Sequence, residues 1–374
     1  MNPLLTGGFF CSLAGCLLLT PLVRRYSASL GLMDDPGERK VHMTPTPRGG
    51  GIAIFLSVML PGIVLVPMLI SANPSVSSGT GSSLLAIAAG ACVLFLTGLA
   101  DDRWSLSWKL RLGIQLLTAA GVVAAGVRAT VFVSQPWFGF VLTVFWILVL
   151  TNALNFLDNM DGLSAGIGMI SSALFAVILL QMVRQPNPAV ACPLLLLSGA
   201  LLGFLFWNRS PASIFMGDCG SNLIGFLLAT LTVAGTFYDE AGGRHVMLAP
   251  LCVMAVPLYD FCTVISIRLL QGRSPFHGDK SHFSHRLVEL GLRPAMAVLT
   301  IHLTTAMTGL GALLLYEVEG WTGAWIVLLL ILLVLAVVGI LEFVGRGSVR
   351  EVQGELSQIR SLRADAAAEE SEAV

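Results

Sequence analysis

The chain is dominated by apolar stretches about as long as a membrane is thick. A helix needs about 20 mostly apolar residues to cross the hydrocarbon core of a bilayer, and about eleven segments reach or approach that length. They are centred near Gly15, Met59, Val93, Ala119, Phe145, Leu174, Leu197, Leu228, Leu258, Ala306 and Leu332. Only 11% of the residues are charged, whereas soluble domains carry about 25%. We therefore predict an all-α integral membrane protein with about eleven transmembrane helices.

The distribution of positive charge predicts the orientation, because cytoplasmic loops retain Lys and Arg. With the N-terminus outside, all but Arg128, Arg184 and Arg244 of the 21 Lys and Arg residues fall on the inner side. We expect a cytoplasmic C-terminus, a polytopic membrane domain over residues 1–344 and a polar cytoplasmic tail over residues 345–374. The tail is expected to be partly disordered, although its apolar spacing also permits a short amphipathic helix.

Four polar residues lie where two of the predicted spans meet, in the segment 151–166. They are Asn152, Asn155, Asp158 and Asp161. Polar side chains at the edge of a membrane span are costly, and they usually face a protein interior or a watery cavity where they act. Their three-residue spacing places them near one another at a helix end. We interpret this segment as a binding surface for a metal ion and a phosphorylated ligand.

Two adjacent carboxylates, Asp101 and Asp102, end the third predicted span, and Lys109 follows shortly afterwards. Adjacent carboxylates repel each other unless a cation lies near, so they indicate a metal site or an acid/base role. Pairing with Arg103 and Lys109 in a solvated cluster at the helix end is an equally good interpretation.

Asp218 lies between glycines in the segment 215–221, at the start of the eighth predicted span. Glycine lets the backbone approach a ligand closely, and free amides at a helix start favour phosphate. Asp218 can also hold a hard cation through oxygen. Taken alone, the motif is better explained by an aspartate N-cap with glycine for tight helix packing.

The loop over residues 271–293 holds His282, His285 and Arg286 close together. One helical turn would place all three on a single cationic face. Zinc is the competing ligand for two histidines, but the neighbouring Lys and Arg suit an anion better. The first loop, residues 34–50, adds Lys40 and His42, and it either lines the same site or anchors the chain to the inner side of the membrane.

All of these clusters fall on the predicted cytoplasmic face. Together they supply oxygen ligands for Mg²⁺, cations for a diphosphate and a carboxylate base, which are the parts that a metal-assisted phosphoryl transfer requires. A site at the membrane boundary indicates that one reactant is a lipid. The rival interpretation is a secondary transporter, which would place its polar residues near the midplane of the membrane.

The chain closely resembles the polyprenyl-phosphate N-acetylhexosamine-1-phosphate transferases, a superfamily that includes the translocase making lipid I. The resemblance covers about residues 30–290. The matching residues are Asp34, Pro36, Arg39, Lys40, His42, Pro47, Gly49, Gly50, Asp101, Asp102, Leu106, Ser107, Lys109, Gln115, Asn152, Asn155, Asp158, Asp161, Gly162, Leu163, the segment 215–221, Asp279, Lys280, His282, His285, Arg286 and Leu287.

This resemblance implies an eleven-helix enzyme, commonly a homodimer, in the inner (plasma) membrane with its active site on the cytoplasmic face. It implies transfer of a sugar-1-phosphate from a UDP-sugar to polyprenyl phosphate with release of UMP, and no nucleic-acid partner. The implied cofactor is Mg²⁺, with Mn²⁺ as a substitute.

The resemblance also implies a role for each matching residue. Asp218 and Asn155 would bind the metal, and Asp101 and Asp102 would activate the lipid phosphate. The implied substrate-binding residues are Lys40, His42, Lys109 near the lipid phosphate, Asn152, Asp158, Asp161 beside the uracil, and His282, His285 and Arg286 at the diphosphate.

The histidine motif departs from the pattern of the translocase branch. That branch has three histidines in a row where this chain has Ser284 followed by His285. The difference favours the branch that uses a simple UDP-N-acetylhexosamine, and it leaves the translocase reaction as the alternative.

Overall fold

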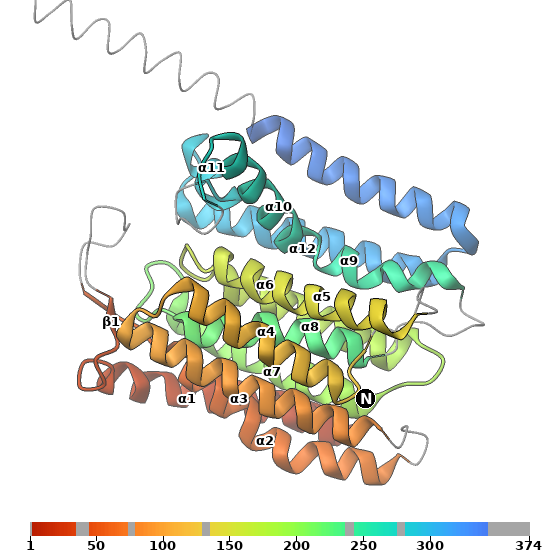
Figure 1. Ribbon diagram of the computed structural model, residues 1–374, viewed down its shortest axis with the longest axis horizontal. Helices are drawn as coiled ribbons and strands as arrows, with labels where there is room; N and C mark the ends of the chain where they lie inside the picture. Colours follow the sequence, from red (N-terminus) through yellow and green to blue (C-terminus); the bar gives the residue numbers. More distant parts are fainter. Residues whose placement is uncertain are drawn as a thin grey trace, which may run out of the picture.

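The protein is a bundle of roughly aligned helices (Figure 1). The computed structural model describes residues 2–34, 45–73, 79–128, 135–235, 243–274 and 281–342. The elements are α1 (Pro3–Tyr26), β1 (Met33–Asp34), β2 (Thr46–Pro47), α2 (Gly50–Ala72), α3 (Thr80–Trp104), α4 (Trp108–Ala124), α5 (Pro136–Leu157), α6 (Leu163–Val177), a π-helical turn (Ile178–Met182), α7 (Pro188–Asn208), α8 (Asp218–Ala234), a 3₁₀ turn (Arg244–Leu248), α9 (Ala249–Val253), α10 (Ala255–Leu270), α11 (Phe283–Glu289) and α12 (Pro294–Glu317). A last helix, Gly320–Glu342, follows α12.

The prediction of a helical membrane protein is confirmed. Within the described ranges, eight helices are long and apolar enough to cross a membrane, or nine if the pair Arg244–Val253 and Ala255–Leu270, bent by 65°, is one span. Each predicted centre lies within a helix. The two remaining predicted spans are the 17-residue helices α4 and α8, so the count of eleven stays a prediction. The predicted tail, residues 345–374, lies outside the described residues.

Helix α8 forms the centre of the bundle. It is buried along nearly its whole length and packs against α2, α3, α5, α6 and α7. The last helix is the opposite case, because it exposes large apolar side chains along its length, among them Trp325, Leu333 and Ile340. Exposed apolar side chains on this scale mark a surface that meets another apolar phase, and in a bundle of spanning helices that phase is lipid. The bundle therefore shields α8 and presents its outer helices to the membrane.

Glycine permits a close contact between α3 and the start of α8. A Cβ atom added to Gly98 on α3 would lie 2.5 Å from the backbone nitrogen and Cα of Cys219. Backbone atoms cannot rotate away as a side chain can, so an alanine there would separate α3 from α8. This contact brings the end of α3 against the first residues of α8.

We predict that Gly98→Ala lowers the stability of the protein by about 1–3 kcal/mol, the usual cost of overpacking. The matched control is Gly113→Ala on α4, where an added Cβ would meet no atom within 4 Å and alanine is the better helix former. The apparent melting temperature in detergent measures both changes. Equal melting temperatures for the two variants would contradict the prediction.

Candidate active site

Asp218, the first residue of α8, is the centre of a polar cluster at the helix ends. Its Oδ1 accepts a hydrogen bond of 2.7 Å from Nδ2 of Asn155, near the end of α5. Its Oδ2 lies 3.4 Å from Nη1 of Arg111 on α4 and 3.8 Å from Nη2 of Arg48. The structure therefore brings together the two predicted metal ligands, Asp218 and Asn155, and adds two guanidinium groups beside them.

Asp102 holds the start of α8 in place. Its Oδ1 accepts a hydrogen bond of 2.8 Å from the backbone N–H of Asp218, and its Oδ2 accepts one of 3.0 Å from that of Cys219. Arg48 Nε pairs with the same carboxylate at 2.9 Å, and the Asp102 side chain is 0% exposed. A helix begins with free N–H groups that require acceptors, and here α3 supplies the acceptor for α8. Asp102 therefore fixes the position of Asp218.

Asp101 is also engaged through both oxygens. Its Oδ1 accepts a hydrogen bond of 2.7 Å from the backbone N–H of Leu106, and its Oδ2 pairs with Arg111 Nη1 at 2.5 Å. The predicted repulsion between Asp101 and Asp102 is thus relieved by two separate arginines. Arg111 links Asp101 to Asp218, so it belongs to the same cluster.

The first loop is pinned to the segment before Asp218 by backbone hydrogen bonds. Phe215 N–H donates to the carbonyl of Pro47 at 2.8 Å, and Gly50 and Gly51 donate to the carbonyls of Phe215 and Met216, each at 2.9 Å. These hydrogen bonds place Arg48 beside the cluster, because Arg48 lies between Pro47 and Gly50 in the sequence. The two predicted binding residues of this loop, Lys40 and His42, lie outside the described residues.

Asn152 is linked to Asp218 through the side chains of two other amide residues. Its Nδ2 donates to Gln115 Oε1 at 2.8 Å, and Gln115 in turn donates to Asn222 Oδ1 at 3.2 Å. Asn222 donates to the backbone carbonyl of Asp218 at 2.8 Å. The amide side chains of Asn152, Gln115 and Asn222 therefore connect α5, α4 and α8 by consecutive hydrogen bonds that end at the backbone of Asp218.

Asp158 and Asp161 occupy the turn between α5 and α6. Burial, and after it the negative charge of Asp218, raises the pKa of Asp158 to about 8. Asp161 Oδ2 accepts a hydrogen bond of 3.0 Å from the backbone N–H of Ala212, which ties the turn to the segment that follows α7. The charge of Asp218 therefore acts on Asp158, whereas Asp161 joins the turn to the segment after α7.

Residues 281–287, which we call the histidine segment, pack against the end of α5. Ser284 Oγ donates to Asn159 Oδ1 at 2.6 Å, and the His282 ring meets the Phe156 ring edge-on with centroids 5.7 Å apart. The centroid of the His285 ring lies 6.4 Å from that of His282. Segments far apart in the sequence thus meet at the end of α5.

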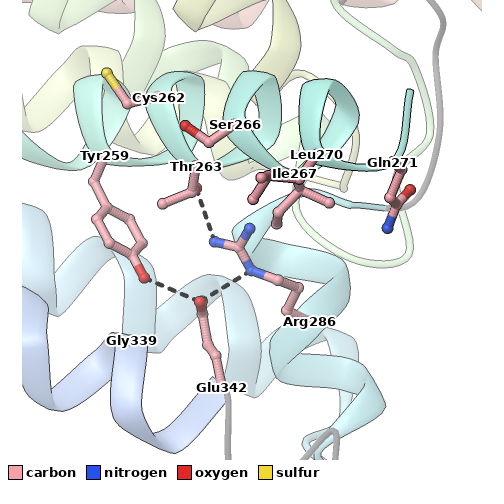
Figure 2. A pocket seen from close by; sticks show the side chains of 10 residues that line it. All are labelled: Tyr259, Cys262, Thr263, Ser266, Ile267, Leu270, Gln271, Arg286, Gly339 and Glu342. Atoms are coloured by element: carbon pink, nitrogen blue, oxygen red, sulfur yellow. Dashed lines mark hydrogen bonds and ion pairs between the residues drawn. The ribbon is translucent and has the colours of Figure 1, made fainter. Parts of the chain in front are cut away.

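Arg286 turns toward the last helix (Figure 2). Its buried guanidinium pairs with Glu342 Oε2 at 3.0 Å through Nε and donates to Thr263 Oγ1 at 3.1 Å. Together with Tyr259 these residues line a cavity of about 550 Å³ between α10, α11 and the last helix. Among the described contacts, none joins Arg286 to Asp218, so its role at a diphosphate stays a prediction.

Sequence reasoning missed three residues of this region. From the sequence, Arg48 and Arg111 count only among the positive charges that orient the protein. The Lys109 ammonium lies 5.7 Å from the centroid of the Trp108 ring, and its role near the lipid phosphate stays a prediction. Asp260, within the ninth predicted span, is wholly buried and bonds to His282 at 2.9 Å. A lone carboxylate inside an apolar span was the one available signal for it.

Comparison with known proteins identifies the family. The sequence model described as glycosyl transferase family 4 matches residues 84–236. A protein of Bacillus subtilis named probable undecaprenyl-phosphate N-acetylglucosaminyl 1-phosphate transferase is 33% identical over 87% of this chain and 88% of its own length. The chain belongs to glycosyl transferase family 4.

Two further relatives carry related names. A decaprenyl-phosphate N-acetylglucosaminephosphotransferase of Mycobacterium tuberculosis is 36% identical over 78% of this chain and 77% of its own length. An undecaprenyl-phosphate alpha-N-acetylglucosaminyl 1-phosphate transferase of Escherichia coli is 29% identical over 83% of both chains. The segment matched by the family 4 model contains Asp101, Asp102, Asn155 and Asp218, so it covers the centre of the cluster.

We predict that Asp102→Asn weakens metal binding as well as activity. An asparagine offers one acceptor oxygen where the carboxylate offers two, so one N–H of α8 loses its acceptor and Arg48 loses its negatively charged partner. Loss of a charge-assisted hydrogen bond costs about 1.5–3 kcal/mol, which corresponds to a roughly tenfold or greater loss of affinity. Mn²⁺ is titrated into the protein in the presence of UDP, and electron paramagnetic resonance of the ion measures the change in affinity.

The matched control is Arg103→Gln, which changes the next residue of α3 at an exposed position. It should bind Mn²⁺ as the unchanged protein does. Normal Mn²⁺ affinity in Asp102→Asn, combined with lost turnover, would show that Asp102 acts in the chemistry and does not position Asp218.

Proposed function

We propose that this protein transfers N-acetylhexosamine-1-phosphate from a UDP-sugar to polyprenyl phosphate. An oxygen of the lipid phosphate forms a bond to the β-phosphorus of the UDP-sugar, the bond from that phosphorus to the bridging oxygen breaks, and UMP leaves. The product would be the first lipid-linked intermediate of a cell-envelope glycan. The observation that carries the proposal is Asp218, which is held by Asn155 and set between two guanidinium groups at the ends of membrane helices.

The oxygen groups around Asp218 suit Mg²⁺. Within the described part of the chain, no three His, Cys, Asp or Glu side chains are grouped so as to hold a metal by themselves. Mg²⁺ does not require such a group, because it is usually bound by one or two carboxylates together with water and substrate phosphates. Asp218 and the Asn155 amide would hold it, and Mn²⁺ would fit the same oxygens. When bound, the metal would supply positive charge to the diphosphate.

The remaining residues would position the two substrates. Arg48 and Arg111 lie beside Asp218 and are placed to meet phosphate oxygens. Asp101 and Asp102 are the proposed groups for activating the lipid phosphate, and each also holds the fold locally, Asp101 through Leu106 and Arg111 and Asp102 through the start of α8. The proposed substrate contacts of Lys40, His42, Lys109, Asn152, Asp158, Asp161, His282, His285 and Arg286 follow from the family resemblance.

We also propose that the cluster faces the cytoplasm. This assignment follows from the positive charge of the loops on that side and from the supply of UDP-sugars there. It includes eleven spans with α4 and α8 as the two shortest, the N-terminus outside, and residues 345–374 as a cytoplasmic tail after the membrane domain over residues 1–344. A homodimer in the plasma (inner) membrane is the proposed assembly.

The test is release of labelled UMP by the purified protein in detergent. We expect release from UDP-N-acetylglucosamine only with both undecaprenyl phosphate and Mg²⁺, and its loss when a chelator is added. A protein that instead accepts a UDP-muramoyl peptide would be a translocase. Counterflow of a labelled solute through vesicles, with no UMP formed, would make it a transporter and overturn the proposal.

A further inference from the structure

We infer that Asp260 is a positioning residue that sets the orientation and tautomer of His282. This inference rests on the proposed function, in which His282 is one of the substrate-binding residues. Asp260 is 0% exposed although it lies on α10, which is part of a bent membrane span. A buried carboxylate is stable only when its oxygens are paired with donors, and both of its oxygens are paired with the histidine segment.

The two hydrogen bonds define which ring nitrogen carries the proton. Asp260 Oδ1 accepts a hydrogen bond of 2.6 Å from the backbone N–H of Phe283, and its Oδ2 lies 2.9 Å from His282 Nδ1. An ionised carboxylate only accepts hydrogen bonds, so His282 Nδ1 carries the hydrogen. Arg268 Nη2, a donor, lies 3.5 Å from His282 Nε2. The Nε2 edge is therefore the edge of the ring that accepts hydrogen bonds.

The same contacts fix the direction of the ring. Asp260 holds the Nδ1 edge against α10, while Phe156 meets the ring from the end of α5. His282 Nε2 faces Arg268, whose guanidinium carbon lies 5.2 Å from the centroid of the Phe156 ring, so this edge of the ring lies beside the end of α5, the helix that bears Asn155. A carboxylate behind a histidine in this way commonly fixes the ring orientation and selects the tautomer.

The competing interpretation is that Asp260 only caps α11. The Phe283 N–H is one of the first free amides of that helix, and accepting from it stabilises the helix start. A cap of this kind affects stability alone. A positioning residue also affects how tightly the UDP-sugar binds, and its effect disappears when His282 is removed. The two interpretations therefore predict different results for a double variant.

The experiment compares Asp260→Asn, His282→Gln and the double variant with Cys262→Ser. Asparagine keeps the size of the side chain but leaves one of the two donors without an acceptor. We expect at least a tenfold higher KM for the UDP-sugar in Asp260→Asn with a smaller change in kcat. The double variant should have a KM within twofold of that of His282→Gln. Cys262→Ser, at an exposed position of α10, should behave as the unchanged protein does.

A nitrogen-15 spectrum of the histidine rings gives a readout independent of activity. The signals absent from His282→Gln identify His282, and they should show hydrogen on Nδ1 in the unchanged protein and lose that pattern in Asp260→Asn. If Asp260→Asn does not fold, the spectrum of the unchanged protein still decides the tautomer, and Asp260→Glu, which keeps two acceptor oxygens, should restore the low KM in part.

Three results would overturn the inference. They are an unchanged KM in a less stable Asp260→Asn, KM effects of the two substitutions that multiply in the double variant, or hydrogen on Nε2 in the unchanged protein. Failure of the proposed function would look different, because the unchanged protein would then release no UMP. In that case the spectrum alone would still test the contact between Asp260 and His282.

Discussion

The site depends on the hydrogen bonds that Asp102 accepts from the first amides of α8. Without a partner, each buried amide would cost about 1–3 kcal/mol, and the start of α8 would have no fixed position. The close approach of Gly98 to Cys219 brings α3 near enough for these bonds to form. This contact therefore fixes the position of Asp218, the first residue of α8. Packing between two membrane helices thus determines where a polar group lies at their ends.

Charge balance explains why the cluster suits a cation and its ligand. Asp101, Asp102 and Asp218 meet Arg48 and Arg111 through ion pairs, and this set of five carries one more negative than positive charge. Like charges at such short separations repel strongly unless they are neutralised. A divalent ion beside Asp218 would reverse the sign of the set, and the phosphates of a nucleotide would then restore the balance. The same excess of negative charge contributes to the raised pKa of Asp158.

The sequence predicted the helices and the convergence of the polar segments better than it predicted their partners. Apolar length locates membrane helices, and alternate crossing of the membrane places the ends of α3 and α5 beside the starts of α4 and α8. Individual contacts depend on the rotation of each helix, which hydropathy does not determine. Lys109 and Arg111 are two residues apart in α4 and so lie on different faces, and the Arg111 face is the one that meets Asp218. Asp260 was missed because its partner, His282, comes from a separate segment.

Two of the three functional residues predicted in this segment, His282 and Arg286, are held by side chains of α10. His282 is held by Asp260 at Nδ1 and lies 3.5 Å from Arg268 at Nε2, and the nitrogens of Arg286 are engaged with Glu342, Thr263 and the carbonyl of Ser281. Breaking a buried ion pair costs about 3–5 kcal/mol, and a charge-assisted hydrogen bond to a phosphate returns about 1.5–3 kcal/mol. Arg286 would therefore reach a diphosphate only if the last helix moved with Glu342. In this arrangement Arg286 anchors that helix, and Asp260 holds His282 in one ring orientation.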